Sequence, residues 1–178
     1  MTDTELALAA REGDREAFGE LIERHAPAAR RVARSILRHR EDADDATQDG
    51  FYSAWRNLGR FDTGRPFGPW LIRIVINAAQ DLRRRRAVRA TEPLPAETAT
   101  SSTPARSYER AEFGRRVDAA LAELPERQRL AVVLFDVEGY SHAEIAQLLG
   151  IPVGTARSDL FHGRRALRAR LNLKGEVE

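Results

Sequence analysis

The chain has 178 residues, of which 42% are hydrophobic and 31% are charged, a balance typical of a water-soluble protein with one ordinary domain or two small ones. It contains no cysteine, which excludes disulfides and thiolate metal sites and suits the reducing cytoplasm. The four histidines are scattered, so neither a metal nor a cofactor is predicted. No apolar run is long enough to span a bilayer and the polar N-terminus is no signal peptide, so we expect a cytoplasmic protein without membrane insertion.

The net charge is only +2, so any preference for a charged partner depends on where the charges lie. Arginine is concentrated at residues 83–89 and 157–170. Such basic clusters on a nearly neutral chain indicate a polyanionic partner.

The N-terminal segments have helical periodicity. Residues 4–11 suit a short helix that Gly13 interrupts, and apolar residues recur at helical spacing from Phe18 to Leu37. Pro27 is expected to kink or restart this long helix. We interpret these segments as ordinary core helices.

Carboxylates crowd the start of the next helix, predicted at residues 42–58. The positive end of a helix dipole accounts for them by itself. Two other interpretations stay open: an acidic, glutamine-bearing face that docks on a basic partner protein, and a metal-dependent nuclease built on Asp42, Asp44, Asp45 or Asp49. The nuclease would show metal-dependent cleavage that Asp45→Asn abolishes, but no histidine or other ligand lies nearby in the sequence. We therefore expect no enzyme.

Two aromatic residues flank a loop. Phe61 and Phe67 lie on either side of residues 62–66, Asp-Thr-Gly-Arg-Pro, whose composition breaks regular structure. Rings on a loop beside basic residues can stack on unpaired bases, at roughly 1–3 kcal/mol for each base. For each ring considered alone, a core position is favoured. Contact with an unpaired nucleic-acid strand is therefore a hypothesis for the loop as a whole.

The segment at residues 70–86 is predicted to be a helix with two faces. Its expected buried residues are Trp70, Leu71, Ile74, Val75, Ala78 and Leu82. An exposed stripe with spacings of three and four is expected to consist of Arg73, Asn77, Gln80 and Arg84. Arginines on such a stripe can contact phosphates and Asn77 can read a base edge, while residues 83–86 form an electrostatic anchor on a phosphate backbone.

Residues 91–107 are rich in Pro, Ser, Thr and Ala and too poor in apolar residues to form a core. We therefore predict an all-α protein of two small helical domains, residues 1–89 and 108–178, joined by a flexible linker at residues 90–107. The second domain is expected to begin with a helix at residues 108–124, followed by a helix that starts at Pro125.

A helix-turn-helix is predicted from Ser141 onward. Ser141 and Glu144 can form a capping box, and Gly150 can end the first helix in a left-handed conformation. The second helix is expected to bury Val153, Ala156, Leu160 and Leu167 and to expose Thr155, Arg157, Ser158, Phe161, His162 and Arg165. Ala146 and Gly154 are expected to let the two helices approach closely. Such a helix fits the major groove of B-DNA, so we interpret the unit as DNA-binding, although the same geometry also occurs as plain packing.

Together these motifs resemble the extracytoplasmic-function (ECF, group IV) sigma factors of bacterial RNA polymerase, within the sigma-70 family, over nearly the whole chain. Residues 42–49 (DADDATQD), with Phe51, Ala54 and Trp55, look like the family's core-binding helix. Residues 70–74 (WLIRI), with Asn77 and the arginine run, are similar to the segment that recognises and melts the minus-ten promoter element. The third match is to the domain that binds the minus-thirty-five element. The residues that resemble it are 124–129 (LPERQR), 139–141 (GYS), 144–146 (EIA) and 150–155 (GIPVGT).

The resemblance implies a promoter-specificity subunit without chemistry of its own. Docking on the clamp helices of the polymerase's largest subunit would involve Asp44, Asp45 and Gln48, and the flap of the second-largest subunit would be a further partner. Minus-ten DNA would be contacted by Phe61, Arg65, Phe67, Arg73, Asn77, Arg83 and Arg84. Minus-thirty-five DNA would be contacted by Thr155, Arg157, Ser158, Phe161 and Arg165. The linker would run toward the RNA exit path, and an anti-sigma factor is an expected partner.

Three residues depart from the family pattern. Asp159 stands where a basic residue is usual, which is expected to lower the affinity for phosphate. Gly163 is expected to loosen the recognition helix. Gly50 is expected to weaken the core-binding helix by up to about 1 kcal/mol relative to alanine.

The chief alternative is a stand-alone helix-turn-helix regulator. It predicts tight operator binding without polymerase, and a palindromic site if the protein is a dimer. The sigma-factor interpretation predicts weak and salt-dependent DNA binding in isolation. Base flipping costs about a few kcal/mol, which contacts held in place by polymerase must offset.

Overall fold

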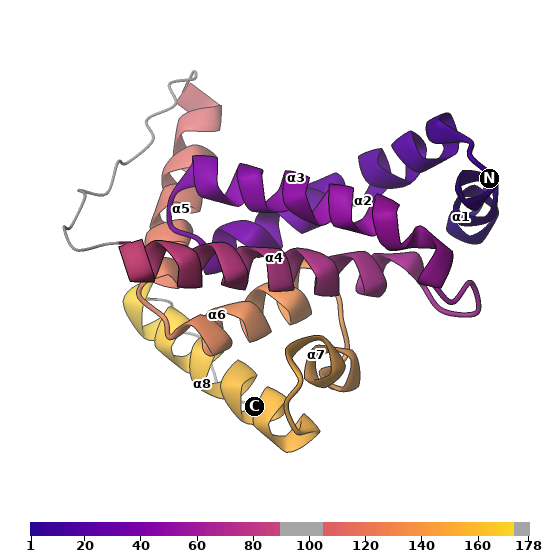
Figure 1. Cartoon of the computed structure of the whole chain (residues 1–178). Coiled ribbons are helices and arrows are strands. Elements are labelled where there is room, and N and C mark those ends of the chain that lie inside the picture. Colours follow the sequence, from indigo (N-terminus) through magenta and orange to yellow (C-terminus); the bar gives the residue numbers. More distant parts are fainter. Residues whose placement is uncertain (90–104, 173–178) are drawn as a thin grey trace. The chain divides into compact units, whose positions relative to one another are not determined.

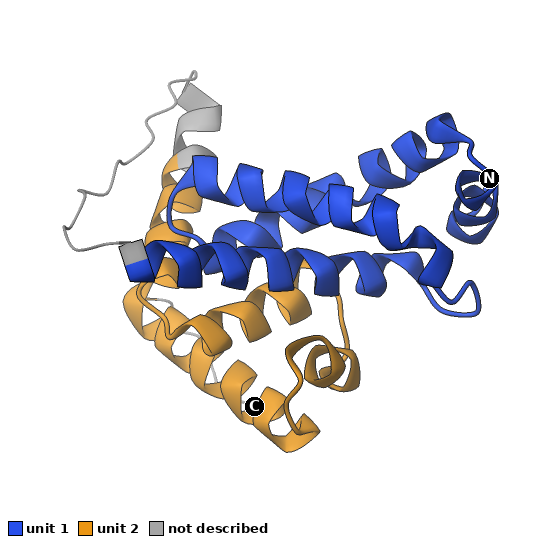
Figure 2. Cartoon of the chain, in the orientation of Figure 1, with its two compact units in different colours: residues 1–94 blue, residues 95–178 orange. Residues whose placement is uncertain are grey.

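The computed structural model of the chain describes residues 1–89 and 105–172, and of residue 89 and residues 105–111 it describes the backbone alone. All regular structure within these two ranges is helical. The chain divides into two compact units, Met1–Leu94 and Pro95–Glu178 (Figure 2). The predicted all-α fold with two small helical domains is confirmed.

The predicted linker at residues 90–107 lies mostly outside the described residues. Its last three residues belong to a helix that begins at Ala105 rather than at Tyr108. Across the described part of the chain, no helix has both the length and the apolar character that crossing a membrane requires.

Within residues 1–89, the first unit has four helices and a short 3-10 turn. They are α1 (Asp3–Arg11), α2 (Arg15–Ile36), α3 (Arg40–Asn57), the turn η1 (Leu58–Arg60) and α4 (Phe67–Arg89). Figure 1 shows α3 and α4 running side by side, and α2 packs against both of them. Helix α2 passes through Pro27 without ending there. The expected core helices are therefore present, and they form one bundle.

Helix α4 is more deeply buried than its sequence pattern predicted. Leu71 and Val75 are buried as expected, but so are Ile72, Ile76 and Ala79. The other expected core positions, Trp70, Ile74, Ala78 and Leu82, are only partly covered. The reason is that α4 contacts α2 and α3 together, so it buries two adjacent stripes rather than one.

Gly50 allows the close approach of α3 to α4. A Cβ atom at this position would lie 2.8 Å from Cγ2 and 3.3 Å from Cα of Val75. Such contacts are too short for a normal carbon pair, and the β-branched valine has little freedom to move away. The expectation that Gly50 weakens this part of the fold is therefore wrong, because its missing side chain is what the packing requires.

We expect Gly50→Ala to lower the free energy of unfolding by up to about 2 kcal/mol. Overpacking costs about 1–3 kcal/mol, and the gain in helix propensity of about 1 kcal/mol offsets only part of that cost. Both tryptophans of the chain, Trp55 and Trp70, lie in this unit, so urea unfolding followed by tryptophan fluorescence reports on it. The matched control is Gly19→Ala in α2, where no atom lies within 4 Å of the added Cβ. Equal stabilisation by both substitutions would contradict this packing account.

Over its described residues, 105–172, the second unit has four helices and one π-helical turn. They are α5 (Ala105–Ala122), α6 (Glu126–Val132), the turn η2 (Val133–Val137), α7 (His142–Leu149) and α8 (Val153–Arg170). Helix α8 packs against α6 and α7, and its contact with α6 is centred on Ala131, Val132 and Leu160. The buried surface of α8 therefore faces the other helices of the unit and leaves the opposite surface free.

The helix-turn-helix forms through the local signals that predicted it. The backbone N–H of Glu144 donates to Ser141 Oγ at 3.3 Å, and the Ser141 N–H donates to the Glu144 carboxylate at 2.8 Å. Gly150 ends α7 with a φ of 66°, which glycine adopts without strain. The capping box and the turn glycine are both confirmed.

Candidate protein- and nucleic-acid-binding surfaces

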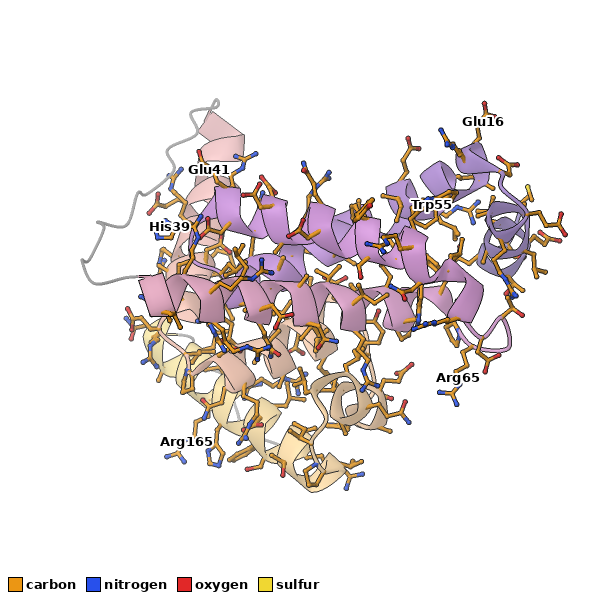
Figure 3. All side chains as sticks on the ribbon, in the orientation of Figure 1. Glu16, His39, Glu41, Trp55, Arg65 and Arg165 are labelled. Carbon is orange, nitrogen blue, oxygen red and sulfur yellow. The ribbon has the colours of Figure 1, made fainter. Side chains whose placement is uncertain are left out.

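The exposed surface of α3 carries the residues expected to dock on a protein partner. Glu41, Asp45, Gln48 and Tyr52 recur at spacings of three and four and are all exposed. Glu41 projects outward near the start of the helix (Figure 3). Asp44 is half-buried, with its Oδ2 atom 3.8 Å from Nε of Arg40. Of the three predicted docking residues, Asp45 and Gln48 are thus fully accessible and Asp44 lies at the edge of the same surface.

Asp42 belongs to the interior of the first unit instead. Its side chain is 5% exposed and forms an ion pair with Arg86 of α4. An inward carboxylate at residue 42 and an outward one at residue 45 do not share one ligand-binding face. Among the described residues there is also no group of three or more His, Asp or Glu side chains that could hold a metal ion.

The loop at residues 62–66 is held by its own aspartate. Asp62 Oδ1 accepts a hydrogen bond from the Gly64 N–H at 3.0 Å, and the Arg65 N–H donates to the Asp62 carbonyl at 3.0 Å. The Arg65 guanidinium is exposed, with Nε 3.4 Å from Asp62 Oδ2. Figure 3 shows Arg65 on this loop, directed away from the helices. The loop therefore presents a fixed backbone and a basic side chain to solvent.

The two aromatic rings beside this loop lie in the core. Phe61 is 4% and Phe67 2% exposed, and their ring centroids are 5.4 Å apart. Each ring also contacts Trp70, at centroid distances of 4.9 Å and 5.5 Å. Neither phenylalanine offers a free face to a DNA base in this conformation. The core interpretation is confirmed for both rings, so neither ring is the exposed DNA contact that the resemblance implied.

The exposed stripe of α4 is present but partly engaged within the protein. Arg73 and Asn77 are exposed, whereas Gln80 is half-buried. In the arginine run, Arg84 pairs with Asp81 and Arg86 pairs with Asp42. The run is therefore less uniform than its sequence suggested, because Arg86 binds a buried carboxylate of α3 and Arg84 pairs with an exposed neighbour on its own helix.

The outer surface of α8 exposes most of the residues expected to meet duplex DNA. Arg157, Ser158 and Arg165 are exposed, Phe161 is 61% exposed, and Thr155 is half-buried. The Phe161 ring lies edge-on to the His162 ring with centroids 5.4 Å apart. Arg165 points away from the ribbon (Figure 3). One helix surface thus combines cationic, hydroxyl and aromatic groups.

Asp159 does not belong to this outer surface. The residue is 6% exposed and its carboxylate faces α6. There it accepts hydrogen bonds from Arg127, at 2.5 Å from Nε and 3.3 Å from Nη2. Asp159 therefore does not face the surface expected to meet phosphate, and its effect on phosphate affinity stays a prediction. The pair connects the recognition helix to α6, and a carboxylate bound by a fork of two N–H groups is a strong form of ion pair.

Gly163 is a second point of close approach between α8 and α6. A Cβ here would lie 2.8 Å from Val132 Cγ2 and 3.0 Å from the Gln128 carbonyl oxygen. Gly163 therefore tightens the seating of the recognition helix, which corrects the expected loosening. Two other residues of α8 were predicted to pack closely against the unit and do not. An added Cβ at Gly154 would have no atom within 4 Å, and Val153 is 39% exposed.

Arg129 is a positioning residue for which the sequence suggested no role. It is 9% exposed, and its Nη1 donates to the carbonyls of Ala122 at 3.1 Å and Leu124 at 3.2 Å. These carbonyls lie at the end of α5, where a helix lacks internal donors. The sequence did contain a signal for this role. It was an arginine on the otherwise apolar side of α6, a few residues after the end of α5.

Tyr140, next to the cap of α7, provides a pH-dependent test of the helix-turn-helix. Burial, together with the carboxylates of Glu138 and Glu144, raises the pKa of Tyr140 to about 12. A pKa raised above the ordinary value of about 10 means that the fold favours the neutral phenol. This stabilisation is complete below pH 10 and is lost as the pH rises toward 12.

We expect an absorbance titration to show one tyrosine that ionises near pH 12, and Tyr140→Phe to remove that step. The substitution should also make the stability of the second unit less dependent on pH between 10 and 12. Tyr52→Phe is the control, because Tyr52 is 64% exposed on the other unit. If Tyr140→Phe left the high-pH step in place, the environment assigned to this phenol would be wrong.

Two family profiles match these two units. Sigma-70 region 2 matches residues 21–89, and sigma-70 region 4 matches residues 114–167. The first match ends with α4 and the second runs from α5 into α8. The two regions in this order define a transcription initiation factor of the sigma-70 type.

Proteins similar to this chain narrow the type of sigma-70 factor to which it belongs. The chain is 41% identical over 172 residues to the ECF RNA polymerase sigma factor SigM of Mycobacterium tuberculosis strain H37Rv, covering 97% of this chain and 83% of that protein. It is 38% identical over 169 residues to the RNA polymerase sigma factor CarQ of Myxococcus xanthus, covering 94% and 95% of the two chains. The chain therefore belongs to the ECF sigma factors of the sigma-70 family.

Solved structures agree with this assignment. CnrH, in complex with the cytosolic domain of CnrY, has a TM-score of 0.71 and 34% identity and covers 97% of this chain and 99% of its own. The sigma factor RpoE, in complex with the anti-sigma factor NepR from Bartonella quintana, has a TM-score of 0.72 and 26% identity and covers 89% and 98%. The chain thus functions as a sigma factor in transcription initiation, and the stand-alone regulator is not supported.

Proposed function

We propose that this sigma factor binds core RNA polymerase through the exposed surface of α3 and contacts promoter DNA at two separate elements. The first unit contacts the opened minus-ten strand, and α8 contacts the minus-thirty-five duplex. The observation that carries the proposal is the opposite chemistry of two exposed helix surfaces, acidic and glutamine-bearing on α3 and arginine-rich with an aromatic residue on α8. An acidic surface suits a protein partner, whereas a basic one suits a phosphate backbone.

The α3 surface would dock on the clamp helices of the polymerase's largest subunit. Asp45 and Gln48 are exposed, so they can bind a partner without giving up contacts inside the fold. Asp44, which is half-buried beside Arg40, would lie at the margin of this interface. The second unit would meet the flap of the second-largest subunit.

The minus-ten strand would lie across α4 and the loop at residues 62–66. Arg65, Arg73 and Asn77 are exposed there, and Arg83 and Arg84 extend the basic surface toward the end of the helix. Phe61 and Phe67 act behind this surface, where their buried rings support both ends of the loop. The rigid Asp62 turn would reduce the entropy lost when the loop binds an unpaired base.

The outer surface of α8 would enter the major groove at the minus-thirty-five element. Arg157 can pair with a guanine edge or a phosphate, Ser158 can bond to either, and Phe161 can contact a thymine methyl group. Arg165 lies two turns further along the helix from Ser158 and would contact the backbone. Thr155, half-buried at the start of α8, would contribute at the edge.

This division of labour requires no chemistry by the chain itself, which we infer to be non-enzymatic. It acts in the cytoplasm, where polymerase and promoter DNA are found. A second protein partner is supported by the solved relatives, because CnrH and RpoE are each seen with a bound partner. We infer that an anti-sigma factor likewise binds this chain.

Reconstituted transcription tests the proposal. The purified chain would be mixed with bacterial core polymerase and a library of genomic fragments, and transcript starts would be mapped. We expect initiation at a small set of promoters, only when the chain is present. An absence of chain-dependent initiation on every fragment would overturn the proposal.

A further inference from the structure

Helix α8 packs against α6 (Figure 1), and two neighbouring contacts join them. At the first, the buried carboxylate of Asp159 accepts hydrogen bonds from Arg127, at 2.5 Å from Nε and 3.3 Å from Nη2. At the second, the missing side chain of Gly163 lets α8 approach Val132 and the Gln128 carbonyl closely. Residues 159 and 163 are four apart, so both contacts lie on one stripe of α8. Together they form the α6 seat of the recognition helix.

The two contacts of the α6 seat constrain different movements. The contact at Gly163 brings the backbone of α8 against α6, which sets the distance between the two helices. It does little to oppose rotation of α8 about its own axis, since glycine has no side chain to interlock. The hydrogen bonds from Arg127 to Asp159 are directional and lose their geometry if α8 turns. The ion pair is therefore the part of the seat that fixes the rotation of α8.

Rotation of α8 matters because the residues expected to read DNA lie next to the seat. Ser158 directly precedes Asp159, and Phe161 follows it by two residues. The ends of helix side chains lie about 5–6 Å from the helix axis, so a rotation of about 20° moves them by roughly 2 Å. Such a displacement exceeds the range of distances over which a hydrogen bond to a base edge holds. A group that sets this rotation therefore affects which bases are read.

The charge of Asp159 also points to an inward role. It is the only acidic residue in α8, where every other charged residue except the histidine is an arginine. A carboxylate on a helix that meets phosphates weakens the attraction unless a cation inside the protein compensates it. The Asp159 side chain is 9% exposed and that of Arg127 is 57% exposed, so the arginine reaches inward from the surface to the carboxylate. Burial leaves Asp159 dependent on Arg127, because little water can replace these two hydrogen bonds.

We propose that Arg127 and Asp159 are positioning residues that set the rotation of α8 in the major groove, and that they thereby help to determine which minus-thirty-five sequence the chain prefers. Neither residue contacts a base: Arg127 acts through Asp159, and Asp159 acts through the backbone of α8. This inference rests on the proposed contact of α8 with the minus-thirty-five duplex. Its sign is opposite to the one that charge alone predicts. Removing the carboxylate weakens recognition even though it makes α8 more basic.

The test measures the preference for an intact minus-thirty-five element with the chain bound to core polymerase. This preference is the ratio of transcript yields from one promoter with an intact and with a scrambled element. Asp159→Asn should lower the ratio by about ten-fold, the effect of losing one base contact, without lowering the yield from the scrambled promoter. Circular dichroism should show a folded variant at the assay temperature, since the arginine left unpaired is open to water.

The control is Arg164→Ala, which removes another ion pair of α8. Arg164 pairs with Asp136 of η2, and the two side chains are 42% and 34% exposed. An exposed pair constrains a helix much less than a buried one. Its loss should lower the stability of the second unit and leave the yield ratio unchanged. An equal fall of the ratio in Arg164→Ala and Asp159→Asn would attribute the effect to stability alone and refute the positioning role.

Exchange of the two charges provides the rescue. Arg127→Asp with Asp159→Arg keeps both charges and the combined length of the two side chains, so the ion pair can form in the opposite sense. The exchanged variant should recover the yield ratio to within about three-fold of wild type. Arg127→Gln should lower the ratio as Asp159→Asn does, and the two substitutions combined should lower it no further, because both remove the same interaction.

Three results would overturn the proposal. One is an unchanged or higher ratio in the folded Asp159→Asn variant. Another is an exchanged variant that is folded and has a ratio as low as that of Asp159→Asn. The third is an equal loss of yield from the intact and scrambled promoters in Arg127→Gln, with a smaller salt dependence of binding, which would show that Arg127 contacts a phosphate itself.

Failure of the α6 seat and failure of the proposed DNA contact are distinguishable. If replacement of Arg157 and Phe161 by alanine abolishes the preference while the variants of Arg127 and Asp159 keep it, only the inference about positioning fails. If neither set of variants changes the preference, the contact of α8 with the minus-thirty-five element fails as well.

Discussion

Replacing Asp45 and Gln48 together by arginine lowers the affinity of the chain for core RNA polymerase by at least about 100-fold and leaves the fold intact. Both side chains are exposed on α3 and are not part of the core, so the change in folding free energy should stay within about 0.5 kcal/mol. A charge reversal and an added cation at the centre of a docking surface cost about 2–5 kcal/mol in binding. The measurement is the binary affinity for core enzyme, with unfolding curves recorded in parallel.

The control for this prediction changes charge elsewhere on the same unit. Glu16→Arg with Glu23→Arg introduces two arginines on exposed positions of α2. This variant should bind core polymerase with nearly the wild-type affinity. If the α3 variant also bound normally, α3 would not be the docking surface.

Replacing Arg157 and Phe161 together by alanine reduces transcription from promoters that need their minus-thirty-five element by about 100-fold. Each good base contact contributes about 1–3 kcal/mol of discrimination, and the two residues lie about one turn apart on the exposed surface of α8. Core affinity should not change, because neither residue belongs to the α3 surface. The measurement is transcript yield on promoters with an intact or a scrambled element.

Arg164→Ala separates lost recognition from lost stability. Arg164 lies on the same helix, but its guanidinium pairs with Asp136 and lies 4.9 Å from the Phe135 ring centroid. Its removal should lower the stability of the second unit while leaving the preference for the intact element unchanged. If the Arg157 and Phe161 variant kept that preference, the assignment of this surface to the minus-thirty-five element would be wrong.

Sequence reasoning succeeded where the determining interactions are local. The capping box of Ser141 and Glu144 spans three residues, and the left-handed turn at Gly150 depends on a single backbone angle. Most of the exposed face of α8 was also predicted, because helical spacing separates its polar side from its apolar side, whereas the docking residues of α3 were implied by the family resemblance. These features contain most of the candidate site.

Sequence reasoning failed where contact with a second helix determines the role of a residue. Gly50 and Gly163 looked like weak helix formers, since a propensity scale considers one helix in isolation, yet each allows a close helix–helix contact. Asp159 looked like a phosphate-repelling group until α6 supplied Arg127 as its partner. Phe61 and Phe67 were favoured as core residues when each ring was considered alone, but the family resemblance also implied that they contact DNA, and the packing of Trp70 against both rings is what that assignment left out.

The most direct test of the account is the affinity for one mapped promoter, measured with the chain alone and with the chain bound to core polymerase. The chain alone should bind weakly, with little preference over scrambled DNA and a steep loss of affinity as salt rises. The complex should bind tightly and protect two separate elements. Tight and selective binding of the promoter by the isolated chain would contradict the claim that polymerase must hold both units for recognition.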